Sequence, residues 1–372
     1  MRVTLADGAL ARHAGRFVWL ELDYDKQENQ AFLVGHGVAW TPAFFVIDPA
    51  DERATATQIG GMTLAELYRF LDQGEAGVKG RPGAPADAAL ARGDALSGQG
   101  RLDDAAAAYR EALRLGGPSW SRRMHTLDLF TSTLQATRDH RACAETAAAE
   151  APGMSRERSF ASVVHVGLGC ANAGGTAAWV EPALRILEPL AVTALEVPAA
   201  LRDDRFQLYQ QLMVAADLRG DKETRARWGD RWLAEIDATK PATDDERTAL
   251  DVARVDAVSI LDDPARALPA LEASERAMPE NYTASSRLAS MATAAGRHDE
   301  ALAACTRGLT HASGAIGRTS LLVTEARAWI GKGDAAKAHR VLEEALRSAR
   351  AIGNQRLRER NVQRISAMIA SP

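Results

Sequence analysis

Three stretches of the sequence repeat one pattern of small and large residues. Residues 100–113 read GRLDDAAAAYREAL, residues 296–309 read GRHDEALAACTRGL and residues 333–346 read GDAAKAHRVLEEAL. In each, an alanine follows the glycine by five positions, a larger residue lies four further on, and a small residue lies three beyond that. These offsets place the three residues on one helical face, and the glycine closes the preceding helix. The pattern therefore predicts helix pairs that pack closely.

The spacing of these stretches predicts a repeat array. Gly93 and Ala289 put small residues upstream, where two helices must cross. Ala267, Ala301 and Ala338 recur at nearly equal intervals along the chain. A helix pair that recurs every ~34 residues has the period of the tetratricopeptide repeat. The segments that resemble this family are 86–118, 282–315 and 319–352, with weaker copies at 120–153, 158–191, 206–239 and 248–281.

The resemblance implies a function for the array. Stacked pairs of this kind form a groove that holds a peptide or a partner domain. The groove residues expected on the first helix of a pair are Arg92, Gln210, Arg254 and Arg287. The pair at 206–239 is degenerate, because it keeps Gly220 but has Arg225 and Trp232 in place of the small residues.

Composition agrees with a helical protein. The 372 residues are 46% hydrophobic and 25% charged, which is typical of a water-soluble chain. Aromatic residues make up only 5%, whereas alanine, the best helix former, accounts for about a fifth of the chain. This composition therefore argues against an all-β fold. The net charge of −4 argues against a nucleic-acid partner, which would require a basic surplus.

The segment 1–78 differs from the rest. Residues 79–85 read as a linker, and residues 86–372 form the array. Before the linker we expect three strands and two helices; the strands are Phe17–Asp23, Ala43–Ile47 and Ala54–Ile59, and the helices are Lys26–His36 and 63–72. The short apolar strand at 43–47 is expected to be covered on both faces. Thr63 and Glu66 form a capping box for the last helix. The fold class is thus mostly α, with a small α/β module in front.

This module resembles the second half of a thioredoxin-like domain. The resemblance rests on FVWLELDYD at 17–25, GVAWTP at 37–42 and the strand and helix that follow. It implies that Pro42 follows a cis bond and that Thr41 and Pro42 contact a client. The Cys-x-x-Cys of that family is absent. Either Met1 is an internal methionine downstream of the motif, or the module is a redox-inactive remnant kept for binding.

The remaining candidate sites have structural explanations. Cys143, Cys170 and Cys305 lie on expected repeat helices, and too few are present for a disulfide framework, so we expect them to pack as buried thiols. The acidic run at residues 23–28 lacks the glycine and distal glutamate of a calcium loop. The uncharged stretch Ser159–Val180 contains too many glycines for a membrane span and is expected to form two helices. The C-terminal arginines 347, 350, 356, 358, 360 and 364 are expected to be a solvated face.

The sequence predicts a non-catalytic protein-binding scaffold with protein or peptide partners. It predicts no catalytic residue, cofactor, metal, nucleic-acid partner or membrane span. One alternative is a thiol–disulfide oxidoreductase whose Cys-x-x-Cys lies upstream, and another is a structural assembly factor. The sequence as given predicts a cytoplasmic protein, and an extracytoplasmic one if an N-terminal segment is missing.

Overall fold

A computed structural model describes the chain except for residues 1–7, 25, 37, 39–41, 60, 63, 80–84, 199 and 371–372. The described residues are mostly α-helical and contain one two-stranded sheet. Contacts divide the chain into two compact units, Met1–Gly220 and Asp221–Pro372. The fold class predicted from the sequence is confirmed.

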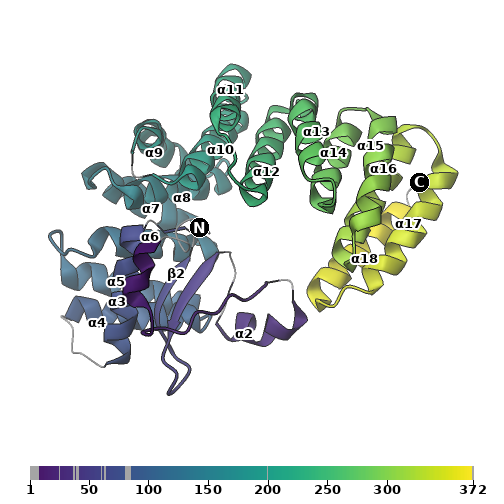
Figure 1. Cartoon of the computed structure of the whole chain (residues 1–372). Helices are drawn as coiled ribbons and strands as arrows, with labels where there is room; N and C mark the ends of the chain where they lie inside the picture. The colour runs from purple at the N-terminus through teal and green to yellow at the C-terminus, as the bar shows by residue number, and fades with distance from the viewer. Residues whose placement is uncertain are drawn as a thin grey trace. The chain divides into compact units, whose positions relative to one another are not determined.

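The first unit opens with a small hairpin and short helices (Figure 1). Its elements before the array are η1 (Gly8–His13), η2 (Gln27–Asn29), α2 (Gln30–Gly35), β1 (Ala43–Ile47), β2 (Ala54–Ile59) and α3 (Leu64–Val78). The strands β1 and β2 are antiparallel, with Ala43 opposite Ile59 and Phe45 opposite Thr57. The bounds of both strands are those predicted from the apolar runs. The predicted cap residue Thr63 and most of the predicted linker lie outside the described residues.

Helices cover β2 and attach the hairpin to the array. The hydroxyl of Thr57 donates to the carbonyl oxygen of Asp94 on α4 (Pro85–Gly98) at 3.1 Å. Helix α3 lies so close to the hairpin that a Cβ on Gly74 would clash with the side chain of Val46. The core of this module consists of Val46, Ala56, Met62, Leu67, Phe70 and Leu71. The hairpin therefore packs between α3 and the first repeat helix.

Two predictions for this module are wrong. Phe17–Asp23 is an extended segment without a strand partner, and Val18 and Leu20 are 88% and 81% exposed. A strand requires a neighbouring strand for its backbone hydrogen bonds, and among the described residues the only sheet is β1–β2. The strand at 43–47 is not covered on both faces either, because Val46 is its only buried residue.

The rest of the chain is a series of helices. In the first unit these are α4, α5 (Leu102–Gly116), α6 (Arg123–Ala136), α7 (His140–Glu150), η3 (Ala151–Gly153), α8 (Arg158–Ala173), α9 (Val180–Leu195) and α10 (Arg202–Leu218). In the second they are α11 (Lys222–Ala238), α12 (Asp244–Leu261), η4 (Pro264–Ala267), α13 (Leu268–Ala277), α14 (Tyr282–Ala294), α15 (His298–His311), α16 (Ala315–Gly331), α17 (Ala335–Arg350) and α18 (Gln355–Ala370). Each segment predicted to be a repeat contains two helices, and the degenerate pair at 206–239 spans the boundary between the units.

The glycines of the repeated pattern act as predicted. Gly100, Gly296 and Gly333 have φ of 71°, 74° and 77°, a conformation that glycine adopts without strain. After each of them, the next backbone N–H donates to a carbonyl five positions earlier, as from Arg297 to Ala292 at 2.8 Å. Gly93 serves close packing, because a Cβ there would stand 2.5 Å from the ring of Tyr109.

The uncharged stretch Ser159–Val180 holds most of α8, a turn at Gly174–Gly175 and the first residue of α9, as predicted. Among the described residues, no helix is long and apolar enough to cross a membrane.

Candidate functional site

The four predicted groove residues lie in different environments. Arg92 is exposed at the surface of α4, and its charge acts on Glu111 of α5. Gln210 is half-buried on α10, and its neighbour Gln211, rather than Gln210 itself, accepts hydrogen bonds from Asn172 of α8. Arg254 and Arg287 lie on α12 and α14 of the second unit, and only these two come together.

In the first unit, the chain's own N-terminal elements cover the face formed by α4, α6 and α8. Strand β2 bonds to α4 through Thr57, and Gln73 of α3 donates to the Asp94 carboxylate at 3.0 Å. The charge of Glu66 on α3 acts on Asp128 of α6 and on Arg158 of α8. A partner therefore finds this part of the face already occupied.

A buried ionic cluster lies beneath α3. The Arg158 guanidinium bonds to Asp128 and to Asp204 of α10, each at 3.1 Å. Ser162 donates to Asp128 at 2.5 Å. Burial raises the pKa of Asp128 to about 6, although the charge of Arg158 opposes that shift. These residues connect three helices. Because their charges pair with one another, we assign them a structural role.

The second unit carries a different cluster, which we call the α12–α14 arginine cluster. It consists of Arg247, Asp251 and Arg254 on α12 and Arg287 on α14. The Asp251 carboxylate accepts a hydrogen bond from Ser274 of α13 at 2.9 Å. Burial raises the pKa of Asp251, while the charges of the three arginines lower it. Burial also lowers the pKa of Arg287, which donates a weak bond to Thr283 at 3.3 Å.

Several buried polar atoms of this cluster lack a hydrogen-bond partner among the described residues. They are Nε of Arg247, Nε of Arg254 and Oδ2 of Asp251. Only the other end of the Arg254 guanidinium is paired, through Nη1 to Asp237 at 2.6 Å. The cluster reaches the surface through the half-buried side chains of Arg247 and Arg287, and neither makes an ion pair with a described residue.

The sequence predicts two of the four residues of this cluster. Arg254 and Arg287 were predicted, whereas Arg247 and Asp251 were not. The signal was present, because residues 247, 251 and 254 have the four- and three-residue spacing of one helical face. Their relation to Arg287 depends on how α12 packs beside α14, which that spacing does not reveal.

The predicted client-binding pair is only partly described. Thr41 lies outside the described residues, and Pro42 directly precedes β1. The described residues contain no group of three or more potential metal ligands that could hold a metal ion.

The prediction for two of the cysteines is wrong. Cys143 of α7 and Cys170 of α8 form a disulfide, with Cα atoms 6.1 Å apart. Neighbouring helices bring them together across a sequence separation of 27, and three cysteines on repeat helices gave no sign of the pairing. Cys305 is a buried thiol, as expected, and burial raises its pKa to about 12.

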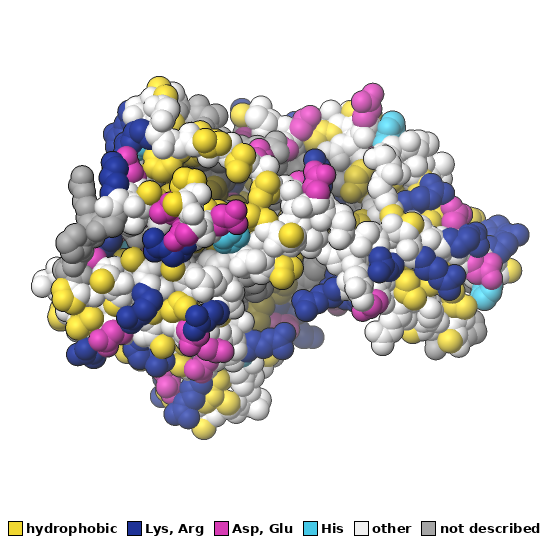
Figure 2. All heavy atoms as spheres, turned by 90° about the horizontal axis from the view of Figure 1, so that it is seen from below, with side chains coloured by type: hydrophobic (Ala, Val, Ile, Leu, Met, Phe, Trp, Pro, Cys, Tyr) yellow, Lys and Arg dark blue, Asp and Glu magenta, His cyan; other side chains and the backbone are white. Residues whose placement is uncertain are grey.

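The C-terminal arginines form the predicted solvated face. Figure 2 shows Lys and Arg side chains gathered over the C-terminal helices. Of the predicted set, residues 347, 350, 356, 360 and 364 are exposed and Arg358 is half-buried.

Comparison with known proteins supports the repeat interpretation. The tetratricopeptide repeat family matches residues 72–119 and 261–316. A tetratricopeptide repeat protein from Parabacteroides merdae is 9% identical over 76% of this chain and all of its own, with a TM-score of 0.46. The TPR2AB domain of yeast Sti1, solved in complex with pHSP90, is 14% identical over 76% of this chain and 98% of its own, with a TM-score of 0.28. No curated protein matches the chain. Within the two matched segments, the chain carries tetratricopeptide repeats.

Proposed function

We propose that this protein is a non-catalytic interaction scaffold that binds a peptide segment of a partner protein at the α12–α14 arginine cluster. The observation that carries the proposal is that Arg247 and Arg287, both half-buried beside the Asp251 carboxylate, make no ion pair with a described residue. A peptide offers carboxylate and carbonyl oxygens to these arginine donors.

The charge balance favours an acidic peptide. Arg247, Arg254 and Arg287 contribute three positive charges, and Asp251 with Asp237, the partner of Arg254, contributes two negative ones. One positive charge is left over. Arginine binds carboxylates through two parallel hydrogen bonds, so an acidic side chain or a free C-terminus is the complementary group.

We place the binding site in the second unit because other elements cover the corresponding helices of the first unit. There the corresponding helices lie under α3 and β2, whereas α12, α14 and α16 follow one another in the second unit (Figure 1). We infer that the N-terminal module serves the fold by covering α4, α6 and α8. Its descent from a thioredoxin-like domain stays a prediction, supported by the β1–β2 hairpin and the α3 helix that follows it.

The test uses the full chain and three pools of fluorescein-labelled hexapeptides that are acidic, neutral or basic. We expect the acidic pool to bind. Its binding should weaken as the salt concentration rises, because the interaction is between charges. Arg287→Gln should weaken binding about tenfold, the equivalent of one charged hydrogen bond. The matched control is Arg276→Gln, which removes an exposed arginine of α13. Equal binding of all pools, or equal binding by both variants, would contradict the proposal.

We also infer a compartment. Disulfides persist in oxidising compartments and are rare in the cytosol. The bond between Cys143 and Cys170 therefore supports the extracytoplasmic alternative. Thiol alkylation of the protein taken from its native cell, before and after reduction, tests it. One reactive thiol after unfolding without reductant is expected, and three would contradict it.

A further inference from the structure

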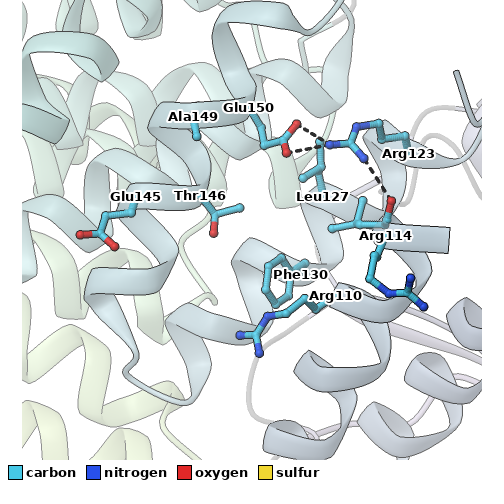
Figure 3. Close-up of a pocket in the computed structure, with 10 residues that line it drawn as sticks. Arg110, Arg114, Arg123, Leu127, Phe130, Glu145, Thr146, Ala149 and Glu150 are labelled. Atoms are coloured by element: carbon cyan, nitrogen blue, oxygen red, sulfur yellow. Dashed lines mark hydrogen bonds and ion pairs between the residues drawn. The ribbon is translucent and has the colours of Figure 1, made fainter. Parts of the chain in front are cut away.

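The first unit carries an open hollow of about 500 Å³ formed by α5, α6 and α7 (Figure 3). It is separate from the α12–α14 arginine cluster, which belongs to the other unit. Its floor is apolar, because Leu113, Leu127 and Phe130 line it and are buried. Ala149 of α7 lines the opposite wall. The volume is sufficient for a compact apolar group such as one aromatic ring.

Most charges around the hollow are already paired. Arg123 donates to both carboxylate oxygens of Glu150 at 2.7 Å. Arg114 is bound to Glu111 by two hydrogen bonds of 2.7 and 2.6 Å. Glu145 accepts a bond from Arg141 at 2.8 Å. Each of these side chains is therefore neutralised by its own neighbour.

Arg110 is the exception. Its guanidinium carbon lies 5.4 Å from the centre of the Phe130 ring, and it makes no ion pair with any described residue. Across the hollow, the side chain of Thr146 on α7 faces α6, while Glu145 points away (Figure 3). The Thr146 hydroxyl has no hydrogen bond to another described residue. One uncompensated cation and one free hydroxyl thus stand over an apolar floor.

We propose that this hollow binds an amphipathic monoanion, a compact apolar group that carries one carboxylate. The apolar group lies on Leu127 and Phe130, the carboxylate pairs with Arg110, and Thr146 donates a second hydrogen bond to it. A single carboxylate matches the single unpaired charge. A neutral ligand leaves that charge unmatched, and a second carboxylate finds no further unpaired cation among the lining residues.

Two sources present this chemistry: a free small acid and the C-terminal phenylalanine of a peptide. The probes are therefore 3-phenylpropionate and a tetrapeptide ending in phenylalanine, each beside its amide. Binding to the full chain is followed by saturation-transfer NMR and calorimetry. We expect at least one acid to bind, and to bind at least tenfold more tightly than its amide. Tighter binding of the peptide acid than of 3-phenylpropionate identifies a peptide end as the source, and the reverse identifies the small acid.

Variants locate the site. Arg110→Gln should weaken binding of the acid at least tenfold and leave binding of its amide unchanged. Ala149→Phe should abolish binding of both, because the larger side chain fills the hollow. Arg185→Gln, which removes an exposed arginine of α9, should bind like the wild type. Circular dichroism melts confirm that each variant is folded. The proposal is overturned if neither acid binds, if acids and amides bind alike, or if both hollow variants bind like the wild type. Arg287→Gln should not affect binding of these probes. A negative result at the hollow is therefore distinct from a negative result for the scaffold proposal.

Discussion

Cys143 of α7 and Cys170 of α8 join two neighbouring helices through a buried disulfide. One turn along, α7 and α8 approach so closely that a Cβ on Gly167 would clash with the Cβ of Ala147. The bond therefore reinforces a contact that the small residues already permit. It restricts the unfolded chain by closing a loop between residues 27 positions apart.

Removing the disulfide should destabilise the first unit. We expect Cys143→Ala with Cys170→Ala to lower the free energy of unfolding by about 3.5 kcal/mol, the loop-closure contribution for a loop of this length. Urea denaturation of the wild type and the double variant measures the difference. Dithiothreitol should lower the free energy of unfolding of the wild type towards that of the double variant. It should leave the stability of the double variant unchanged. A wild type that is insensitive to reduction would contradict the role of the bond.

Breaking the buried ionic cluster should cost more than breaking a surface pair. Arg158→Ala leaves Asp128 and Asp204 buried without their cation, and we expect a loss of about 3 to 5 kcal/mol. Arg185→Ala removes the exposed pair with Glu181 and should cost less than about 1 kcal/mol. Thermal and urea melts of both variants provide the comparison. Similar losses would show that the cluster contributes no more than a surface pair.

The helical pairs could be predicted because their signals are local. The glycine of each repeated stretch takes a positive φ, and Gly93 meets Tyr109, so sequence spacing and structure report the same requirement. The strand expected at 17–23 failed for the opposite reason. A run of apolar, β-branched residues predicts a strand only where another strand lies beside it, and pairing is a property of the tertiary fold.

The candidate sites could be predicted only in part for the same reason. Arg254 and Arg287 were predicted from their places on repeat helices, and the spacing of residues 247, 251 and 254 marks one face of α12. The approach of Arg287 to that face depends on how α12 packs beside α14, which the sequence does not show. The Arg158 cluster joins residues 30 and 46 positions apart, and nothing in the sequence around any one of them signals the others. Likewise, the uncompensated charge of Arg110 depends on which acidic side chains its neighbours engage.

Close helix packing makes Gly93 sensitive to the smallest substitution. In Gly93→Ala the new methyl group would stand 2.5 Å from the Tyr109 ring. We expect a loss of about 1 to 3 kcal/mol from overpacking, despite the better helix propensity of alanine. In Gly35→Ala, on α2, the methyl group meets nothing within 4 Å, so the change should be within about 0.5 kcal/mol. Stability equal to the wild type in Gly93→Ala would mean that α4 and α5 are farther apart.

Asp94 should make the stability of the first unit depend on pH. It is buried between Tyr109 and Gln73, and burial raises its pKa from 3.8 to about 7. Between those values the folded chain holds a proton that the unfolded chain has released. The free energy of unfolding contributed by Asp94 therefore falls as pH rises from about 4 to 7, by on the order of 1 kcal/mol per pH unit.

Asp94→Asn tests this dependence, because the amide resembles the protonated acid at every pH. We expect the variant to gain stability relative to the wild type as pH rises from 5 to 7.5, measured by urea denaturation at each pH. His125 and His165, whose pKa values burial lowers to about 4, act in the opposite direction. Their contribution is the same in both proteins and cancels in the difference. A difference that stays constant across this range would show that Asp94 is ionised throughout and that the hydrogen bond from Tyr109 outweighs its burial.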